Sequence, residues 1–377
     1  MNGLFQVEEL RTKTGAKIKV IGVGGGGCNM INHMINENVC GIDLVVANTD
    51  SQALDGSLAP TKIQLGAKLT RGLGAGMKPE VGKGAAEESY QEIKAILEGA
   101  DMVFVAAGLG GGTGTGAAEV VAQAAKEVGA LTVAVVTKPF IFEGQKRRKF
   151  ADEGLVGVKQ SCDSIVVIPN DKLLAIVDKN MGIKDSFRIV DNVLSRAVTG
   201  ISGVILKHGD NDINLDFADL KTVMSHRGTA LMGVGEANGN EAAYQAMKNA
   251  IESPLFDNIS ISGAMGVLVH FNMHPNYPLV QIQQAMSIVY ESASADADVI
   301  FGTTTDENID MDKVVITIVA TGFEKEAMNN PIREVPQAAA QDRAQAVKSI
   351  RKISGGYDVT FDEDELQVPT YLRRQMD

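Results

Sequence analysis

The stretch "GLGGGTGTGAAE", residues 108–119, contains seven consecutive glycines and threonines from Gly110 to Gly116. Glycine loses much conformational entropy when it is ordered, so a run of this kind needs a structural reason. The residues before it, "ADMVFVAA", predict a short buried strand, and the residues after it, "AAEVVAQAAKEVGA", predict a helix that opens at Gly116. A strand that leads through a glycine loop into a helix brings backbone N–H groups close to a phosphate. This stretch therefore predicts a phosphate-binding loop.

Short runs of β-branched residues recur in the first half of the chain, at 17–24, 44–48, 102–107, 131–136 and 164–169. Because they show little polar alternation, they predict strands buried on both faces, hence a parallel sheet between helical layers. Residues 186–207 carry apolar side chains at the spacing of one long amphipathic helix (187, 190, 194, 197, 201 and 204). Four more strand-like runs then alternate with helical segments around 240–253 and 278–293. The predicted fold class is α/β: a parallel, Rossmann-like nucleotide-binding domain, a long central helix and a smaller α/β domain with a mixed sheet.

The expected domain organisation follows from these patterns and from a change in composition after Phe323. We expect a flexible N-terminal segment (1–15), a nucleotide-binding domain (16–185), the central helix (186–208), a second domain (209–323), a disordered linker (324–360) and a partner-binding peptide (361–377). The linker has too few large apolar residues to bury a core. The terminal peptide ends in an apolar cluster followed by two arginines: Leu366, Val368, Pro369, Tyr371, Leu372, Arg373 and Arg374. Such a motif on a tether is typical of partner binding, and a tail that folds back on its own domain is the alternative.

Composition excludes several classes of protein. The chain has 377 residues, is 45% hydrophobic and carries a formal net charge of −12, which indicates a globular protein and argues against nucleic-acid binding. Its three cysteines are too few for a disulfide framework and show no zinc spacing, which suits a cytoplasmic protein. The N-terminus has no signal-peptide pattern, and the uncharged run 102–118 is interrupted by the glycine loop. We expect no stretch that spans a membrane and no metal-ligand set.

Three glycine loops, rather than one, follow or adjoin the predicted strands. Residues 22–29, "GVGGGGCN", contain the dinucleotide spacing G-x-G-x-x-G, and 71–79, "RGLGAGMKP", and 110–116 are the other two. The first loop alone suggests a nicotinamide-dependent dehydrogenase. Three loops that each donate N–H groups fit a ligand with several phosphates in a row better, and the chain lacks the P-loop motif. Tight turns explain one such loop more easily than three.

"GGGTGTG" at 110–116 matches the signature of the tubulin and FtsZ superfamily. The stretches "NTDSQAL" (48–54), "KLTRGLGAGMKPEVGKGAAEES" (68–89), "PFIFEGQKR" (139–147), "IPNDKLL" (168–174) and "NLDFADLKTVMS" (214–225) resemble its FtsZ family in order. The resemblance covers about residues 16–323 and resumes at "LQVPTYLRRQ". It implies a GTPase that polymerises head to tail into the bacterial division ring, on the inner face of the cytoplasmic membrane at midcell. Cys28 and Met77–Lys78 depart from the family's usual residues without removing a backbone donor.

The resemblance also implies the nucleotide-binding residues. The phosphates of GTP or GDP would contact the glycine loops and a neighbouring asparagine: Gly25, Gly26, Gly27, Cys28, Asn29, Asn48, Gly74, Ala75, Gly76, Gly110, Gly111, Gly112, Thr113, Gly114 and Thr115. Glu143 and Arg147 would reach the ribose and phosphate region. From the sequence alone, an i,i+4 salt bridge on a solvated helix face is the simpler interpretation of that pair.

Guanine selection depends on two residues of the long helix. Phe187 and Asp191 are spaced i,i+4, so a ring and a carboxylate share one helix face. A carboxylate can accept both N1–H and N2–H of guanine, and Asn170 could complete that edge. The alternative places Phe187 in the core and Asp191 on the surface; the resemblance favours the binding role.

Hydrolysis needs a group that orients the attacking water, and the glycine loops contain none. In "NLDFAD", Asp216 and Asp219 begin a new helix, which alone would suggest a helix cap. The resemblance implies instead that Asn214, Asp216 and Asp219 enter the next subunit's nucleotide site. It also implies Mg²⁺ on the phosphates, leaves room for K⁺, and implies assembly regulators and membrane-attached adaptors such as FtsA, which would bind the terminal peptide. A superfamily member that binds GTP without hydrolysing it is the remaining alternative.

Overall fold

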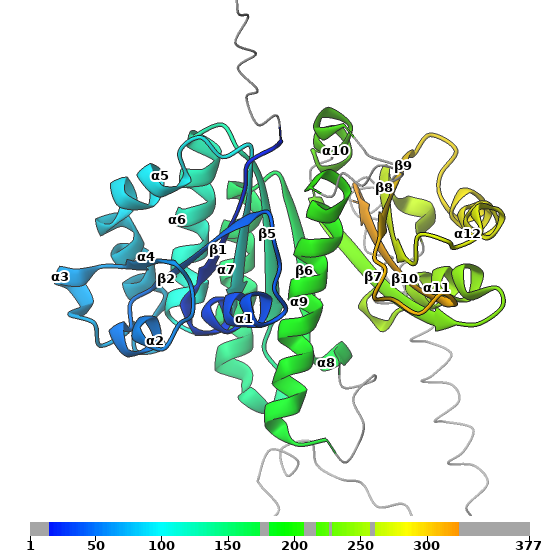
Figure 1. Ribbon diagram of the computed structural model, residues 1–377. Coiled ribbons are helices and arrows are strands. Elements are labelled where there is room, and N and C mark those ends of the chain that lie inside the picture. Colours follow the sequence, from blue (N-terminus) through cyan, green and yellow to red (C-terminus); the bar gives the residue numbers. More distant parts are fainter. Residues whose placement is uncertain (1–14, 174–180, 207–215, 226–227, 257–260, 324–377) are drawn as a thin grey trace, which may run out of the picture. The chain divides into compact units, whose positions relative to one another are not determined.

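Ten strands joined edge to edge in the order β3-β2-β1-β4-β5-β6-β7-β10-β8-β9 form the scaffold of the chain. The computed structural model describes residues 15–173, 181–206, 216–225, 228–256 and 261–323 (Figure 1). The strands are β1 (Ile18–Val23), β2 (Ile42–Asn48), β3 (Thr61–Gln64), β4 (Met102–Gly108), β5 (Leu131–Lys138), β6 (Ser164–Pro169), β7 (Gly228–Asn238), β8 (Gly266–Met273), β9 (Asp298–Thr305) and β10 (Lys313–Thr321).

The strands from β3 to β7 are all parallel, and both faces of this part of the sheet are buried. Val20 of β1 lies opposite Leu44 of β2 and Phe104 of β4. Alternate residues point to opposite faces of a strand, so Val20 and Phe104 pack in one hydrophobic cluster while Ile21 and Val105 pack in another. This two-sided burial explains why the strands show no polar alternation in the sequence.

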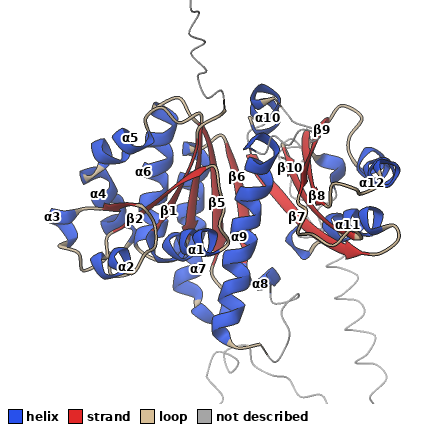
Figure 2. Ribbon diagram, viewed as in Figure 1, coloured by secondary structure: helices blue, strands red, loops and turns tan. Residues whose placement is uncertain are grey.

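Helices cover both faces of the parallel strands (Figure 2). The cluster on one face includes α1 (Gly24–Asn36), α9 (Ile183–Leu206) and α10 (Phe217–Met224). The other face packs against α4 (Pro79–Glu88), α5 (Tyr90–Leu97), α6 (Thr113–Glu127) and α7 (Gln145–Ser161). A third cluster joins β8 and β10 to α11 (Ala242–Ile251) and α12 (Leu279–Ser292). Short elements complete the described part: α2 (Ser51–Asp55), α3 (Ala67–Thr70), α8 (Asn170–Leu173) and the 3₁₀ turns η1 (Ile141–Glu143), η2 (Pro254–Phe256) and η3 (Ile261–Gly263).

The long helix α9 is buried between the parallel strands and the mixed strands. Its buried side chains recur at helical spacing, among them Val190, Leu194, Ala197, Ile201 and Val204. They share one cluster with α1 and with Leu268 and Val319 of β8 and β10. By length and composition α9 could cross a membrane, which corrects the expectation that no stretch could do so, but 67% of that stretch is buried inside the protein. Its apolar character is therefore explained by its place in the core.

Strand β7 connects the two kinds of sheet. Its first three residues, Gly228 to Ala230, pair in parallel with β6. From Leu231 to Asn238 it pairs instead with the antiparallel β10, which in turn pairs with β8. Strand β9 then runs parallel to β8, so this second part is a mixed sheet. No β7 residue in these registers pairs on both sides, so the strand leaves one sheet as it enters the other.

The predicted fold class is confirmed by this arrangement: parallel strands, a long helix and a mixed sheet in sequence. Two expectations about the glycine loops are wrong. The helix expected to open at Gly116 begins at Thr113, and the first loop is short because α1 begins at Gly24. In both helices most of the glycines, Gly24, Gly27, Gly114 and Gly116 among them, pack closely against other backbone, and these contacts outweigh the poor helix propensity of glycine. The N-terminal segment up to residue 14, the linker and terminal peptide from 324 to 377, and Asn214 lie outside the described residues.

Candidate functional site

The three glycine loops predicted from the sequence meet at one place, beyond the carboxyl ends of β1 and β4. Gly24 has a positive φ of 71°, and a side-chain carbon added there would lie 2.7 Å from the backbone nitrogen of Gly114. A carbon added to Gly112 would lie 3.0 Å from the backbone nitrogen of Lys78, in the loop before α4. The loops therefore pack backbone against backbone, which only glycine permits. Ligands of open α/β sheets bind at this end of the strands.

Two helices direct their N-termini toward this place. Helices α1 and α6 both begin in the glycine loops, and their first N–H groups have no partner within the helix. A side-chain carbon added to Gly25, Gly76 or Gly111 would meet nothing within 4 Å, so these residues border open space. Exposed backbone N–H groups and two positive helix ends form an anion site that suits a chain of phosphates.

Hydroxyl groups hold the loops together. Thr115 Oγ1 accepts a hydrogen bond from the N–H of Gly110 at 2.8 Å. The hydroxyls of Thr49 and Thr113 lie 2.6 Å apart, which joins the end of β2 to the start of α6. The loop geometry is therefore fixed by the protein itself before any ligand binds.

Cys28 and Asn48 are buried beneath the loops. Asn48 Nδ2 donates to the Cys28 sulfur at 3.7 Å, and Asn48 Oδ1 accepts from the N–H of Asp50 at 3.3 Å. Burial raises the pKa of the Cys28 thiol to about 11, so the side chain is neutral. The side chains of these two predicted phosphate-site residues support the loop from below.

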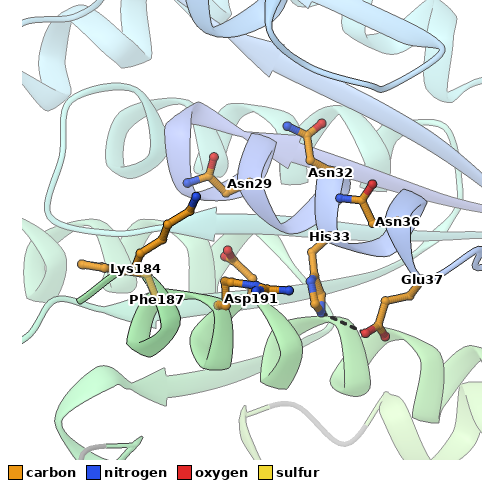
Figure 3. A pocket seen from close by; sticks show the side chains of 9 residues that line it. Asn29, Asn32, His33, Asn36, Glu37, Lys184, Phe187 and Asp191 are labelled. Carbon is orange, nitrogen blue, oxygen red and sulfur yellow. Dashed lines mark ion pairs between the residues drawn. The ribbon is translucent and has the colours of Figure 1, made fainter. Parts of the chain in front are cut away.

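A pocket of about 560 Å³ lies between α1 and the N-terminal half of α9 (Figure 3). Both helices line it, mostly with polar residues beside one aromatic ring: Asn29, Asn32, His33, Asn36 and Glu37 on or just after α1, and Lys184, Phe187, Arg188 and Asp191 on α9. The side chain of Asp191 reaches from α9 toward α1, and His33 forms an ion pair with Glu37 at 3.5 Å. The pocket adjoins the phosphate loops through Asn29, the sixth residue of α1.

Asp191 and Phe187 both line this pocket, so the sequence alternative of a core phenylalanine and a surface aspartate does not describe them. Burial raises the pKa of Asp191 to about 7. Phe187 is 40% exposed and makes an edge-to-face contact with Phe140, with ring centroids 5.5 Å apart. Asn170, at the end of β6, is buried, and its Oδ1 has no hydrogen-bond partner within the described residues. Unpaired buried oxygens are costly and indicate a missing donor.

Glu143 and Arg147 bind each other in this structure. Arg147 Nη1 lies 2.6 Å from Glu143 Oε2, and Glu143 Oε1 accepts from the N–H of Phe140 at 3.0 Å. The salt bridge that the i,i+4 spacing suggested is therefore present. The pair lies beside the loops, because a side-chain carbon at Gly110 would touch the Arg147 carbonyl oxygen at 2.9 Å.

Asp216 and Asp219 are far from this pocket in the same chain. Asp216 caps α10, and its Oδ1 accepts from the N–H of Ala218 at 2.9 Å; both carboxylates are exposed. Helix α10 lies near the C-terminal end of α9 (Figure 1). From Asp191 to Leu206, α9 rises roughly 22 Å at 1.5 Å per residue. The two acids therefore cannot reach the pocket of their own subunit.

Of the polar side chains that α1 contributes to the pocket, sequence reasoning found only Asn29, as a phosphate-site residue, and missed Asn32, His33 and Asn36. Asn29, Asn32, His33 and Asn36 recur at helical spacing opposite the buried Met30, Ile31 and Met34. Such a stripe is detectable in the sequence, but it also describes a solvated helix face. The Oδ1 atom of Asn32 already accepts hydrogen bonds within the protein, from Ser57 Oγ and from the N–H of Leu58.

Among the described residues, those near the phosphate loops offer a few oxygen atoms to a hard cation but do not form a complete set of metal ligands. Within the described part of the chain, no group of three or more His, Cys, Asp or Glu side chains is placed to hold a metal ion. The hydroxyls of Thr49 and Thr113 are the side-chain oxygens at the start of α6. They suit Mg²⁺, which keeps waters and is usually held by few protein ligands together with phosphates.

Comparison with known proteins agrees with this geometry. Residues 17–178 match the family model described as "Tubulin/FtsZ family, GTPase domain", and residues 228–324 match "FtsZ family, C-terminal domain". Two Helicobacter pylori proteins named "Cell division protein FtsZ", from strains 26695 and J99, are each 48% identical over the whole chain and 97% of their own length. The FtsZ dimer of M. jannaschii is 46% identical, with a TM-score of 0.79 over 83% of this chain and 90% of that one. CetZ2 from Haloferax volcanii, at 20% identity and a TM-score of 0.69 over 89% of this chain and 99% of that one, shares the fold.

Proposed function

The chain belongs to the FtsZ family, and from this premise we propose that its GTP is hydrolysed at the junction between two successive subunits of a filament. It is a GTPase and a filament-forming cell-division protein of the cytoplasmic division ring, not a nicotinamide-dependent dehydrogenase. Our proposal concerns which residues bind the nucleotide, which residues activate the water, and how the filament is held in place.

In the proposed site, the N–H groups at the starts of α1 and α6 bind the phosphates, and the pocket between α1 and α9 binds guanine. Phe187 stacks on the base, Asp191 accepts N1–H and N2–H, and the unpaired oxygen of Asn170 accepts a further donor. Glu143 and Arg147 contact the ribose and phosphate region once the nucleotide competes for their mutual salt bridge. Residues 16–185 are then the GTP-binding domain, and 186–208 the helix that joins it to the domain 209–323.

The separation of Asp191 from Asp216 is the observation that carries the proposal. The base pocket and the exposed acids lie at opposite ends of α9, roughly 22 Å or more apart along the helix. A head-to-tail filament brings opposite ends of neighbouring subunits together. Asp216 and Asp219 of one subunit then polarise the water at the next subunit's phosphates, and Asn214, two residues before Asp216 in the sequence, helps to orient it.

Metal ions belong to the same proposal. Mg²⁺ would be held chiefly by the nucleotide phosphates, with the hydroxyls of Thr113 and Thr49 as the nearby protein oxygens. When bound, it neutralises charge on the transferred phosphoryl group. We also propose that K⁺ activates the hydrolysis, and replacing K⁺ by Na⁺ in the hydrolysis assay tests this role.

We also propose that the terminal peptide 361–377 holds the filament at the inner face of the cytoplasmic membrane at midcell, through an adaptor such as FtsA. Tyr371 and Leu372 would fill a pocket on the adaptor while Arg373 and Arg374 meet acids at its rim. A protein of formal charge −12 is not attracted to anionic lipid by itself. Many weak contacts along one filament would add up to firm attachment.

A change of base specificity tests whether the acids act on the neighbour's nucleotide. Xanthine presents an acceptor where guanine has its N2–H donor, so Asp191→Asn should prefer xanthosine triphosphate to GTP. The double variant Asp191→Asn, Asp216→Ala then binds xanthosine triphosphate but lacks Asp216, without which its remaining Asp219 should not support hydrolysis at a neighbour. Mixed one to one with wild-type protein and GTP, about half of its pockets should face wild-type acids in a head-to-tail filament.

The measurement is release of labelled phosphate from xanthosine triphosphate. We expect none from the double variant alone, clear release after wild-type protein is added, and none when the added protein is Asp216→Ala. The single variant Asp191→Asn, which should hydrolyse xanthosine triphosphate by itself, is the positive control. A mixture that stays silent while this control is active would show that each subunit uses its own acids.

A further inference from the structure

Three phenylalanine rings form a continuous row from the base pocket to the protein surface. Phe187 lines the pocket, and Phe140 contacts it edge to face, with ring centroids 5.5 Å apart and an interplanar angle of 89°. Phe142 stacks on Phe140, with ring centroids 5.0 Å apart and an interplanar angle of 14°. The exposed fraction is 40% for Phe187, 3% for Phe140 and 65% for Phe142. Only the middle ring is enclosed by protein.

The backbone at Phe140 and at the next residue is held by two hydrogen bonds to carboxylates. The N–H of Phe140 donates to Glu143 Oε1 at 3.0 Å, and the N–H of Ile141 donates to Asp171 at 2.9 Å. Phe140 also belongs to the hydrophobic cluster that includes α1 and α9. Its ring is therefore held from the backbone side and from the core side.

Phe187, by contrast, has a half-open environment on a helix face. A half-exposed aromatic ring can rotate about its side-chain torsions unless a neighbour restricts it. Phe187 makes a perpendicular, edge-to-face contact with the ring of Phe140, and such pairs prefer one mutual orientation. A stacking surface for a base must keep its plane fixed to bind without an ordering cost.

We propose that Phe140 is a positioning residue, which fixes the ring plane of Phe187 for stacking on guanine. It does not touch the nucleotide and acts only through Phe187. Because the exposed Phe142 of η1 stacks on Phe140, the row also connects the base pocket to the protein surface. This inference rests on the proposed base site, and its test separates the two.

A double-mutant cycle in the full-length chain provides the test. Phe140→Leu keeps an apolar side chain and removes the ring edge, and Phe187→Leu removes the stacking surface. Affinity for a fluorescent ribose-labelled GDP is measured for wild type, both single variants and the double variant. Phe140→Leu should weaken binding about three- to ten-fold in the wild-type background and leave it unchanged in the Phe187→Leu background.

Competition by inorganic tripolyphosphate separates positioning from general damage, because this ligand uses the phosphate loops and has no base. Its affinity should be the same in wild type and Phe140→Leu. Phe271→Leu, which truncates a fully buried ring in the cluster around β8, is the matched control for lost packing and should leave GDP affinity unchanged.

Each contrary result has a distinct meaning. If Phe187→Leu weakens GDP binding and Phe140→Leu does not, the positioning role is refuted while the base site stands. Equal losses from Phe140→Leu in both backgrounds, or a parallel loss of tripolyphosphate affinity, would also refute it. If Phe187→Leu has no effect, the proposed base site itself is wrong.

Discussion

Lowering the pH should weaken guanine nucleotide binding through Asp191. Burial raises the pKa of this carboxyl to about 7, well above its ordinary value, so the free protein loses the charge near neutrality. Guanine needs the ionised form, because a protonated carboxyl carries a donor that faces the base's own N–H groups. With this pKa the ionised fraction falls from about 90% at pH 8 to about 10% at pH 6. Affinity should therefore fall about tenfold across this range.

The assay is binding of fluorescent GDP to the monomer at pH 6, 7 and 8 and constant ionic strength. Asp191→Asn is the matched control, since it keeps the other titratable and charged groups of the pocket, His33, Glu37, Lys184 and Arg188, as well as the titration of the nucleotide phosphates. The variant should bind GDP more weakly at pH 8 and show a much flatter profile. If wild type and variant lose affinity in parallel as the pH falls, Asp191 does not accept from the base in its ionised form.

Three further predictions concern stability, hydrolysis and attachment. In the nucleotide-free protein Asp191→Asn should raise the free energy of unfolding by up to about 4 kcal/mol at pH 8 and little near pH 4. The reason is that the raised pKa of the Asp191 carboxyl destabilises the folded protein only as the pH rises from the pKa of the unfolded state through that of the native state. Urea unfolding at both pH values measures the effect, and equal effects at both would contradict the prediction. Asp216→Ala and Asp219→Ala should each abolish phosphate release with monomer GTP affinity nearly unchanged, and Asp216→Asn should do the same while keeping a helix cap whose loss costs about 1 kcal/mol. Equal loss of binding and turnover would mean that the acids serve their own subunit. Deleting residues 361–377 should leave GTP-dependent sedimentation intact and abolish membrane recruitment in cells, a result overturned by membrane-bound rings built from the truncated protein alone.

The strands were predictable because burial on both faces leaves a local signature. The run 102–107 is apolar at every position, 131–136 is apolar except for Thr132, and both lie in the parallel sheet. The short strand β3, with only Ile63 buried, has no such signature. The joining of both sheets through β7 was also not predictable, because its pairing with β6 involves only three residues far apart in sequence.

Helix starts in the glycine loops depended on contacts that no local pattern contains. A side-chain carbon at Gly114 would collide with the carbonyl oxygen of Gly108, and one at Gly116 with that of Pro79. These glycines are helical because other backbone segments lie against them. Which segments these are depends on the tertiary fold and cannot be read from the local sequence. The pair Phe187 and Asp191 was found by its spacing, but its opposite wall on α1 could be found only after α1 and α9 were seen to pack together.

The short pairing between β6 and β7 has a mechanical consequence. Within each sheet the strands are held by directional hydrogen bonds in a fixed register, whereas across the junction only Gly228 to Ala230 continue the ladder. Most of the adhesion there comes from the apolar side chains around α9, and such contacts have no preferred direction. A subunit pulled at its two ends is therefore stiff within each half and compliant between them. The halves can slide by a small amount along α9 at the expense of few hydrogen bonds, so that tension in a filament is absorbed at this junction before either sheet is strained.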